Sequence, residues 1–169
     1  MELINKAAKA HYLDASALIK LILDCQDEEP GRKELRNYFN SESKPFFTTS
    51  ICFAETIGIL KKKQKKIISE DEYIQAFKKL MIMVFGNAIK RDDMNIAKPD
   101  IFNQAKKIVE SYKLDFADAL QIVTLKSGMF SHMCGESQSI FITADNNLAK
   151  ACINENIRVW NCVKTPKPE

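Results

Sequence analysis

Short apolar runs alternate with segments of helical periodicity along most of this 169-residue chain. The runs HYL (11–13), PFFTT (45–49) and IFIT (140–143) each lead directly into a helix-like segment, and IRVWNC (157–162) follows the last helix. Strands that alternate with helices favour an α/β domain with a mainly parallel central sheet. A chain of this length is typical of one hydrophobic core, so we expect a single domain over residues 1–169 with its core at about 11–162.

Helix signals support this order. Ser69 and Glu72 form a capping-box pattern, Pro99 stands at a first helical position, and Gly128 ends an apolar helical segment. The run AIKRDDMNIA (88–97) fits a strand or a loop equally well. Together with the helices that carry these signals, helices are predicted at 16–23, 30–40, 50–63, 69–85, 99–113, 115–128 and 146–154.

Composition excludes several classes of protein. A chain with 46% hydrophobic and 28% charged residues is typical of soluble globular proteins, and a net charge of +3 does not by itself indicate a nucleic-acid-binding protein. The five cysteines form no C-x-x-C pair, and with only two histidines in the chain we do not expect HMC (132–134) to hold a metal. No signal peptide or apolar stretch of membrane-spanning length is present, so we expect a reduced, cytoplasmic protein with no membrane contact.

Carboxylates stand at positions that are unfavourable for an isolated charge. Asp14 and Asp145 each follow an apolar strand directly, and helix capping is a sufficient explanation for either one alone. Capping cannot explain Glu55, which lies inside the apolar segment SICFAETIGIL, although a Glu at a helix edge can also reach solvent. Asp118 lies in a similarly apolar helix, with Asp115 one turn earlier on the same face.

Convergence of these acids on one site explains their positions. An ionised carboxylate is costly to bury unless it is paired or bound to a metal, and the few arginines (32, 36, 91 and 158) do not match these positions. Ligands of open parallel sheets bind beyond the carboxyl ends of the strands, which is where Asp14 and Asp145 fall. A set of oxygen ligands suits Mg²⁺ or Mn²⁺, and such sites serve phosphoryl chemistry.

The four acidic motifs, in this order, resemble those of PIN-domain ribonucleases over residues 12–162. They read YLDASALIKL, TTSICFAETIGILKK, LDFADALQIVT with its D-A-L pattern, and FITADNNLAKA with its T-x-D pattern. The resemblance implies a PIN-like three-layer α/β/α domain and a metal-dependent endoribonuclease that hydrolyses RNA phosphodiester bonds with Mg²⁺ or Mn²⁺. It implies that the catalytic and metal-ligating residues are Asp14, Glu55, Asp118 and Asp145, supported by Ser16 and Thr143, with Asp115 at most accessory.

The chain also resembles the VapC-like toxin of type II toxin–antitoxin modules, which implies an antitoxin partner beside the RNA substrate. It departs from the compact toxin pattern through additional segments at 61–98 and 128–138. The stretch LMIMVF (80–85) fits a core helix, but methionine is also common on partner-binding surfaces, so an antitoxin or homodimer contact there stays open.

Other functions are compatible with parts of this pattern. The lysine run KKKQKK is either a solvated helix end or an RNA contact formed by Lys61, Lys62, Lys63, Lys65 and Lys66. A haloacid-type phosphatase would need a second Asp where Ser16 stands, and nucleotide-binding glycine-rich loops are missing from the sequence. The main alternative is a catalytically inactive PIN-like module that binds RNA or a protein partner.

Overall fold

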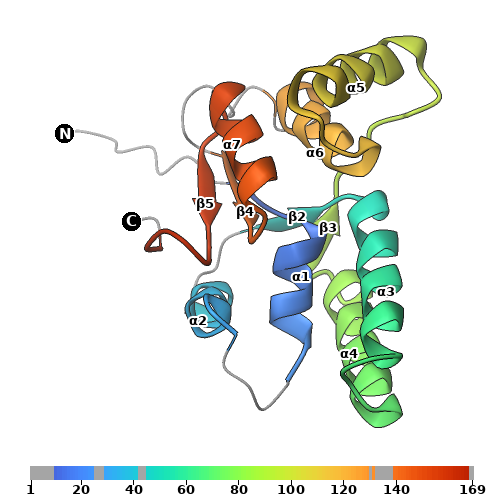
Figure 1. Ribbon diagram of the computed structural model, residues 1–169, viewed down its shortest axis with the longest axis vertical. Helices are drawn as coiled ribbons and strands as arrows, with labels where there is room; N and C mark the ends of the chain where they lie inside the picture. Colours follow the sequence, from blue (N-terminus) through green and yellow to red (C-terminus); the bar gives the residue numbers. More distant parts are fainter. Residues whose placement is uncertain (1–9, 25–28, 42–44, 130, 132–138, 168–169) are drawn as a thin grey trace.

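A computed structural model describes residues 10–24, 29–41, 45–129, 131 and 139–167. Its centre is a parallel sheet with the strand order β3-β2-β1-β4-β5 (Figure 1). Every strand pair is parallel, so each connection between neighbouring strands crosses over through helices. The strands are β1 (Ala10–Leu13), β2 (Phe46–Thr48), β3 (Ile89–Arg91), β4 (Ser139–Thr143) and β5 (Val159–Asn161).

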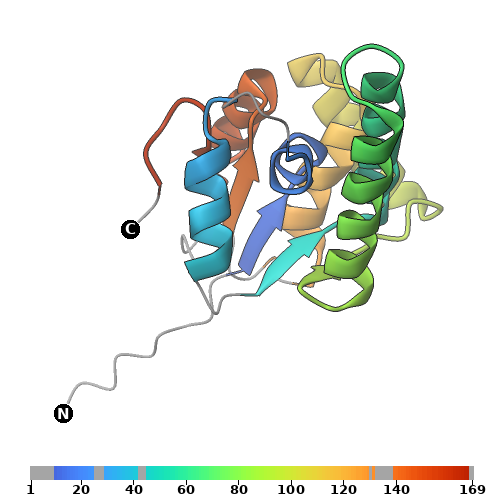
Figure 2. The same ribbon diagram turned by 90° about the horizontal axis from the view of Figure 1, so that it is seen from below.

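Helices cover both faces of the sheet, which gives the expected three-layer α/β/α fold. One face packs against α1 (Ala15–Ile22), α2 (Arg32–Ser41), α3 (Ser50–Gln64) and α4 (Glu70–Phe85). The other packs against α5 (Pro99–Tyr112), α6 (Phe116–Ser127) and α7 (Asn146–Asn154). Seen from below, α1 lies over the middle of the sheet, with α2 on one side and α3 and α4 on the other (Figure 2).

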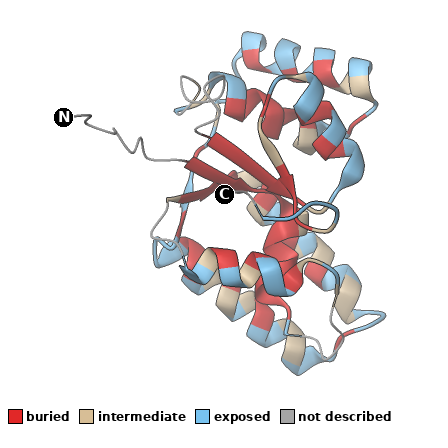
Figure 3. Ribbon diagram, turned by 90° about the vertical axis from the view of Figure 1, so that its left-hand side faces the viewer, coloured by how far each residue is buried: buried red, intermediate tan, exposed pale blue. Residues whose placement is uncertain are grey.

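The alternation of side chains along each strand builds the two cores. In β1, Leu13 packs into the core on the α1 side, whereas Tyr12 packs into the core on the α6 side. In β4, Ile140 and Ile142 face the first core and Phe141 faces the second. Because both faces are covered, the central strands are buried along their whole length (Figure 3) and read as continuous apolar runs.

The helix signals of the sequence are confirmed. Ser69 and Glu72 form a capping box at the start of α4, Pro99 opens α5, and Gly128 caps the end of α6. The ambiguous run at 88–97 contributes the edge strand β3, in which only Ile89 is buried. Both exposed residues of β3 are charged, which explains why its sequence looks equally like a loop.

The additional segment 61–98 consists of the end of α3, then α4, β3 and the chain that leads to α5. Within LMIMVF, Leu80, Met83 and Val84 lie in the core, whereas Ile82 and Phe85 are exposed. Most of the other additional segment, 128–138, lies outside the described residues, as does HMC. Across the described ranges, no helix is both long and apolar enough to cross a membrane.

Candidate active site

The carboxyl ends of β1 and β4 bring Asp14 and Asp145 to the same edge of the sheet. The two strands are paired neighbours, with Leu13 in register with Ile142. The amide of Asp14 continues this pairing by donating a hydrogen bond to the carbonyl of Ile142 at 3.3 Å. Each Asp then begins a helix, α1 or α7, as the side-chain N-cap.

Asp14 is the most firmly held carboxylate at this edge, with only 3% of its surface exposed. Its Oδ1 accepts a hydrogen bond from the amide of Ala17 at 2.7 Å, and its Oδ2 accepts one from the hydroxyl of Thr143 at 2.6 Å. The Ser16 hydroxyl lies 2.9 and 2.8 Å from the two oxygens. Burial nevertheless raises the pKa of Asp14 to about 6, against the opposing effect of these hydrogen bonds.

Ser16 and Thr143 connect the two strand ends to each other. The Ser16 hydroxyl accepts a hydrogen bond from the amide of Ala144 at 2.7 Å, and the Thr143 hydroxyl accepts one from the amide of Asp145 at 2.9 Å. Both hydroxyls also donate to Asp14. The orientation of the Asp14 carboxylate is therefore fixed by residues from both sides of the β1–β4 pair.

Asp145 caps α7, as the simplest interpretation of its sequence position predicts. Its Oδ1 accepts hydrogen bonds from the amides of Asn147 and Leu148, at 2.7 and 2.9 Å. Both cap bonds use the same oxygen, and the side chain is exposed. The charge of Asp145 still acts on Asp14, whose pKa is raised mainly by burial and further by this neighbour. Capping and membership of an acidic cluster are thus compatible at this residue.

Glu55 and Asp118 reach the same region from α3 and α6. Glu55 is half-buried, and its Oε2 is buried without a hydrogen-bond partner in the described part of the chain. Burial raises the pKa of Glu55, and the charges of Asp115 and Asp14 raise it further. The pKa of Asp118 rises to about 7, mainly through burial and then through Asp115 and Asp14.

Asp115 contributes more to this cluster than its sequence pattern indicates. It is the N-cap of α6, accepts a hydrogen bond from the amide of Asp118 at 2.9 Å, and is exposed. Among the charged neighbours of Glu55 and of Asp118, Asp115 has the largest effect on the pKa of each. Asp118 lies in the first turn of α6, three residues after the N-cap Asp115, whereas Glu55 lies in the interior of α3.

The donor set fits a divalent cation. The predicted ligands are all oxygen atoms, they repel one another, and one buried oxygen of Glu55 has no donor among the described residues. Within those residues, no three His, Cys, Asp or Glu side chains are already arranged to hold one ion. The carboxylates are close enough to raise one another's pKa values. Their side chains would have to move closer together to coordinate one cation.

Two polar residues lie beside the cluster: Gln121, which sequence reasoning did not single out, and Lys62, which it named only as part of the lysine run. Gln121, only 3% exposed, donates from Nε2 to Oδ1 of Asp118 at 3.4 Å, and its Oε1 has no partner in the described region. Lys62 lies two helical turns after Glu55 on the same face of α3, and its charge opposes the rise in the pKa of Glu55. The sequence signal that indicates both residues is helical spacing from an acid: Gln121 follows Asp118 by three residues, and Lys62 follows Glu55 by seven.

The lysine run does not form one uniform surface. Lys61 donates to Gln64 at 2.6 Å and lies 5.1 Å from the centre of the Tyr73 ring. Lys63 lies 3.8 Å from Glu29, in a partly exposed ion pair. Lys62 is the member of the run whose charge acts on Glu55 of the acidic cluster.

Comparison with known proteins addresses the fold and the family. The model of the PIN domain family matches residues 11–154. The crystal structure of PAE2754 from Pyrobaculum aerophilum is similar, with a TM-score of 0.54 and 16% sequence identity over 86% of each chain. At that identity the likeness shows a common fold. No curated protein sequence matches the chain.

Proposed function

This chain belongs to the PIN domain family, whose members are typically metal-dependent nucleases, and from this premise we propose that it is a Mg²⁺- or Mn²⁺-dependent endoribonuclease. It would hydrolyse RNA phosphodiester bonds. The observation that carries the proposal is the buried, unpartnered Oε2 of Glu55 beside other acids whose pKa values are raised. A group of this kind has an excess of negative charge that a divalent cation would balance.

Each residue of the site has a distinct task in this proposal. Asp14, Glu55, Asp118 and Asp145 would hold the cation, which supplies Lewis acidity toward the phosphodiester and promotes formation of the attacking hydroxide. Ser16 and Thr143 keep the Asp14 carboxylate in one orientation through their hydroxyl groups. Lys62 would attract the RNA backbone toward the acids, whose own charge repels it.

Cleavage of a mixed single-stranded RNA pool tests the activity. We expect cleavage with Mg²⁺ or Mn²⁺, none with excess EDTA, and a loss of at least about 100-fold in Asp14→Asn and in the nearly isosteric Glu55→Gln. Asp100→Asn, which changes an exposed acid in the first turn of α5, is the matched control and should cleave normally. Full activity in EDTA or in Asp14→Asn would refute the proposal. RNA binding without cleavage under every metal condition would instead indicate an inactive RNA-binding module.

We further propose that the protein is the toxin of a toxin–antitoxin pair and acts in the cytoplasm as a single domain. The support is the resemblance of its acidic motifs to VapC-like toxins. Induced expression should arrest growth with the wild-type chain but not with Asp14→Asn, and co-expression of an adjacent small reading frame should relieve the arrest. Normal growth during production of an active nuclease would contradict the toxin role and leave the nuclease proposal intact.

A further inference from the structure

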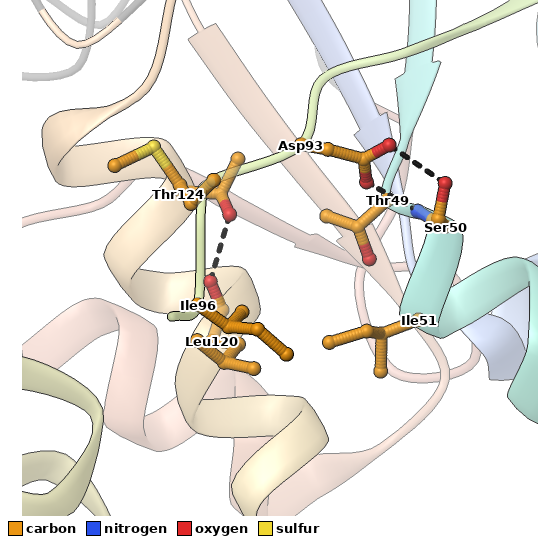
Figure 4. A pocket seen from close by; sticks show the side chains of 8 residues that line it. Thr49, Ser50, Ile51, Asp93, Ile96, Leu120 and Thr124 are labelled. Atoms are coloured by element: carbon orange, nitrogen blue, oxygen red, sulfur yellow. Dashed lines mark hydrogen bonds between the residues drawn. The ribbon is translucent and has the colours of Figure 1, made fainter. Parts of the chain in front are cut away.

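An apolar pocket of about 220 Å³ lies between the start of α3 and the middle of α6 (Figure 4). Ile51 stands on one side, with Ile96 and Leu120 facing it across the pocket. Ile96 forms part of the rim, since 47% of its surface is exposed. The pocket is therefore open to a ligand and has apolar walls.

The polar groups around the pocket are occupied by internal hydrogen bonds. The Ser50 amide and hydroxyl donate to the two carboxylate oxygens of Asp93, each at 2.6 Å. The Thr124 hydroxyl donates to the carbonyl of Leu120 at 2.8 Å. The Ser50–Asp93 bonds hold the Asp93 segment against the start of α3, and the Thr124–Leu120 bond lies within α6. Because these walls are held by internal hydrogen bonds, the pocket is largely preformed.

Helices α3 and α6 contribute residues both to the pocket and to the acidic cluster. Ile51 lies one turn before Glu55 on the same face of α3, whereas Leu120 and Asp118 belong to the same helix α6 but point to different sides of it. A third wall residue, Thr49, follows β2 directly. Asp14 directly follows β1, the strand paired in parallel with β2, so Thr49 and Asp14 lie at the same edge of the sheet.

We propose that this pocket binds one nucleobase of the RNA, on a nucleotide next to the phosphodiester that the acidic cluster cleaves. The inference rests on the proposed nuclease function and specifies its substrate as RNA that is unpaired at this position. A base in a duplex is stacked and paired, whereas an unpaired base can turn out and bury its faces against apolar side chains. Ile51 lies one helical turn from Glu55 on the same face of α3, so a nucleotide whose phosphate is held at the carboxylates can extend its base toward the pocket.

Nuclear magnetic resonance of the isoleucine methyl groups tests base binding directly. The wild-type chain in EDTA is titrated with each of the four ribonucleoside 5′-monophosphates and with ribose 5-phosphate, none of which contains a phosphodiester bond that could be cleaved. We expect the signals of Ile51 and Ile96 to shift with nucleotides but not with ribose 5-phosphate. Ile82 on α4 and Ile153 on α7 are exposed reference residues whose signals should stay unchanged.

A matched pair of variants separates the pocket from general surface effects. Ile96→Ala should weaken nucleotide binding at least about fourfold, the effect of one buried methylene group. Ile82→Ala removes an equally large exposed side chain from another face and should have no effect. In cleavage assays, Ile96→Ala should raise KM for unpaired RNA, and an abasic nucleotide next to the cleaved bond should abolish the difference between variant and wild type.

The possible outcomes distinguish this inference from the proposed function. Equal shifts with ribose 5-phosphate, or equal shifts of Ile82, would overturn base binding. Shifts with N-acetyl-leucine amide but with no nucleotide would also overturn it and assign the pocket to an apolar side chain of a protein partner. If nucleotides shift the Ile51 and Ile96 signals but the protein never cleaves RNA, the base site is supported and the nuclease proposal is refuted. If the protein cleaves RNA but nucleotides do not shift these signals, the nuclease proposal is supported and the base site is refuted.

Discussion

At the scale of single residues, Asp145 shows that one carboxylate can have two tasks. Its Oδ1 caps α7, yet its charge also raises the pKa values of Asp14, Glu55 and Asp118. Capping predicts its position from the sequence, but capping alone says nothing of its neighbours in space. The proximity of Asp145 to Asp14 depends on the pairing of β1 with β4, which no local pattern contains.

Replacing Asp145 with Asn separates these tasks. Asn caps as well as Asp, so the variant without metal should melt at or above the temperature of the wild type, because one repelling charge is lost. Mn²⁺ at a hundredfold excess over Kd should stabilise the wild type by about 2.7 kcal/mol. That stabilisation corresponds to a rise in Tm of about 5–10 °C. The rise should shrink in Asp145→Asn.

Thermal melting in Mn²⁺ and in EDTA measures both effects. Asp145→Ala is the companion variant, because it removes the cap as well and should lower Tm in either condition, at a cost of about 1 kcal/mol. An identical rise in Tm with Mn²⁺ in wild type and Asp145→Asn would show that Asp145 is only a cap.

Gln121 is a second residue with a testable role, that of positioning Asp118. Replacement with Leu removes the unpartnered Oε1 and should stabilise the fold by about 1 kcal/mol. It also removes the Nε2 donor to Asp118, so kcat should fall several-fold while KM is retained. Urea unfolding and steady-state cleavage are measured on the same samples. An unchanged kcat, with a shifted stability, would show a purely structural residue.

At the scale of secondary structure, most elements were predictable because each has a local signal. Buried apolar runs predicted β1, β2, β4 and β5, and caps or periodicity predicted the helices. The edge strand β3 was not assigned, because an exposed edge needs only one buried residue. The strand order depends on tertiary packing, so no segment of sequence read alone contains it. Gln121 and Lys62, by contrast, lie at helical spacing from Asp118 and Glu55 on the same helices, so their positions beside these acids have a local signal.

Helix α3 carries Glu55 and most of the lysine run. Neighbouring lysines point to different sides of this helix, so we expect their replacement to have different effects on RNA binding. Lys62→Gln should weaken RNA binding and reduce the slope of log K against log salt by about 0.7, the value for one phosphate contact on a single strand. Lys61→Gln and Lys63→Gln are matched controls, since these lysines contact Gln64 and Glu29 instead. Binding is measured by fluorescence anisotropy over a salt series in EDTA. Equal losses of RNA affinity in the three variants would show that the lysine run acts as a uniform charged surface and that Lys62 has no special role.

At the scale of the whole molecule, the acidic cluster makes the stability of the metal-free fold depend on pH. The folded pKa of Asp14 is about 6, against 3.8 when the residue is unperturbed. A folded state that binds a proton more tightly loses stability as pH rises from about 4 to about 6, and the full penalty is present above that window. For Asp14 it is on the order of 3 kcal/mol, and Asp118, with a pKa of about 7, extends the window upward.

Urea unfolding in EDTA at pH 5 and pH 7.5 checks this dependence. The wild type should be less stable at pH 7.5, the difference should shrink in Asp14→Asn, and Asp100→Asn should match the wild type. Mn²⁺ should restore stability at pH 7.5. A stability that rises between these two pH values in wild type would contradict the raised pKa of Asp14.

The parallel sheet also sets when, during synthesis on the ribosome, the site can exist. Thr143, whose hydroxyl orients Asp14, follows it by 129 residues, and β4 must insert beside β1 before that bond can form. Pairings so distant in the chain form late in folding. On the proposed nuclease function, a nascent chain that ends before β4 carries Asp14 and Glu55 but no assembled site, so it should leave the ribosome's own RNA intact during translation. Stalled chains ending at residue 138 should leave RNA intact in Mn²⁺, whereas chains released after residue 167 should cleave it.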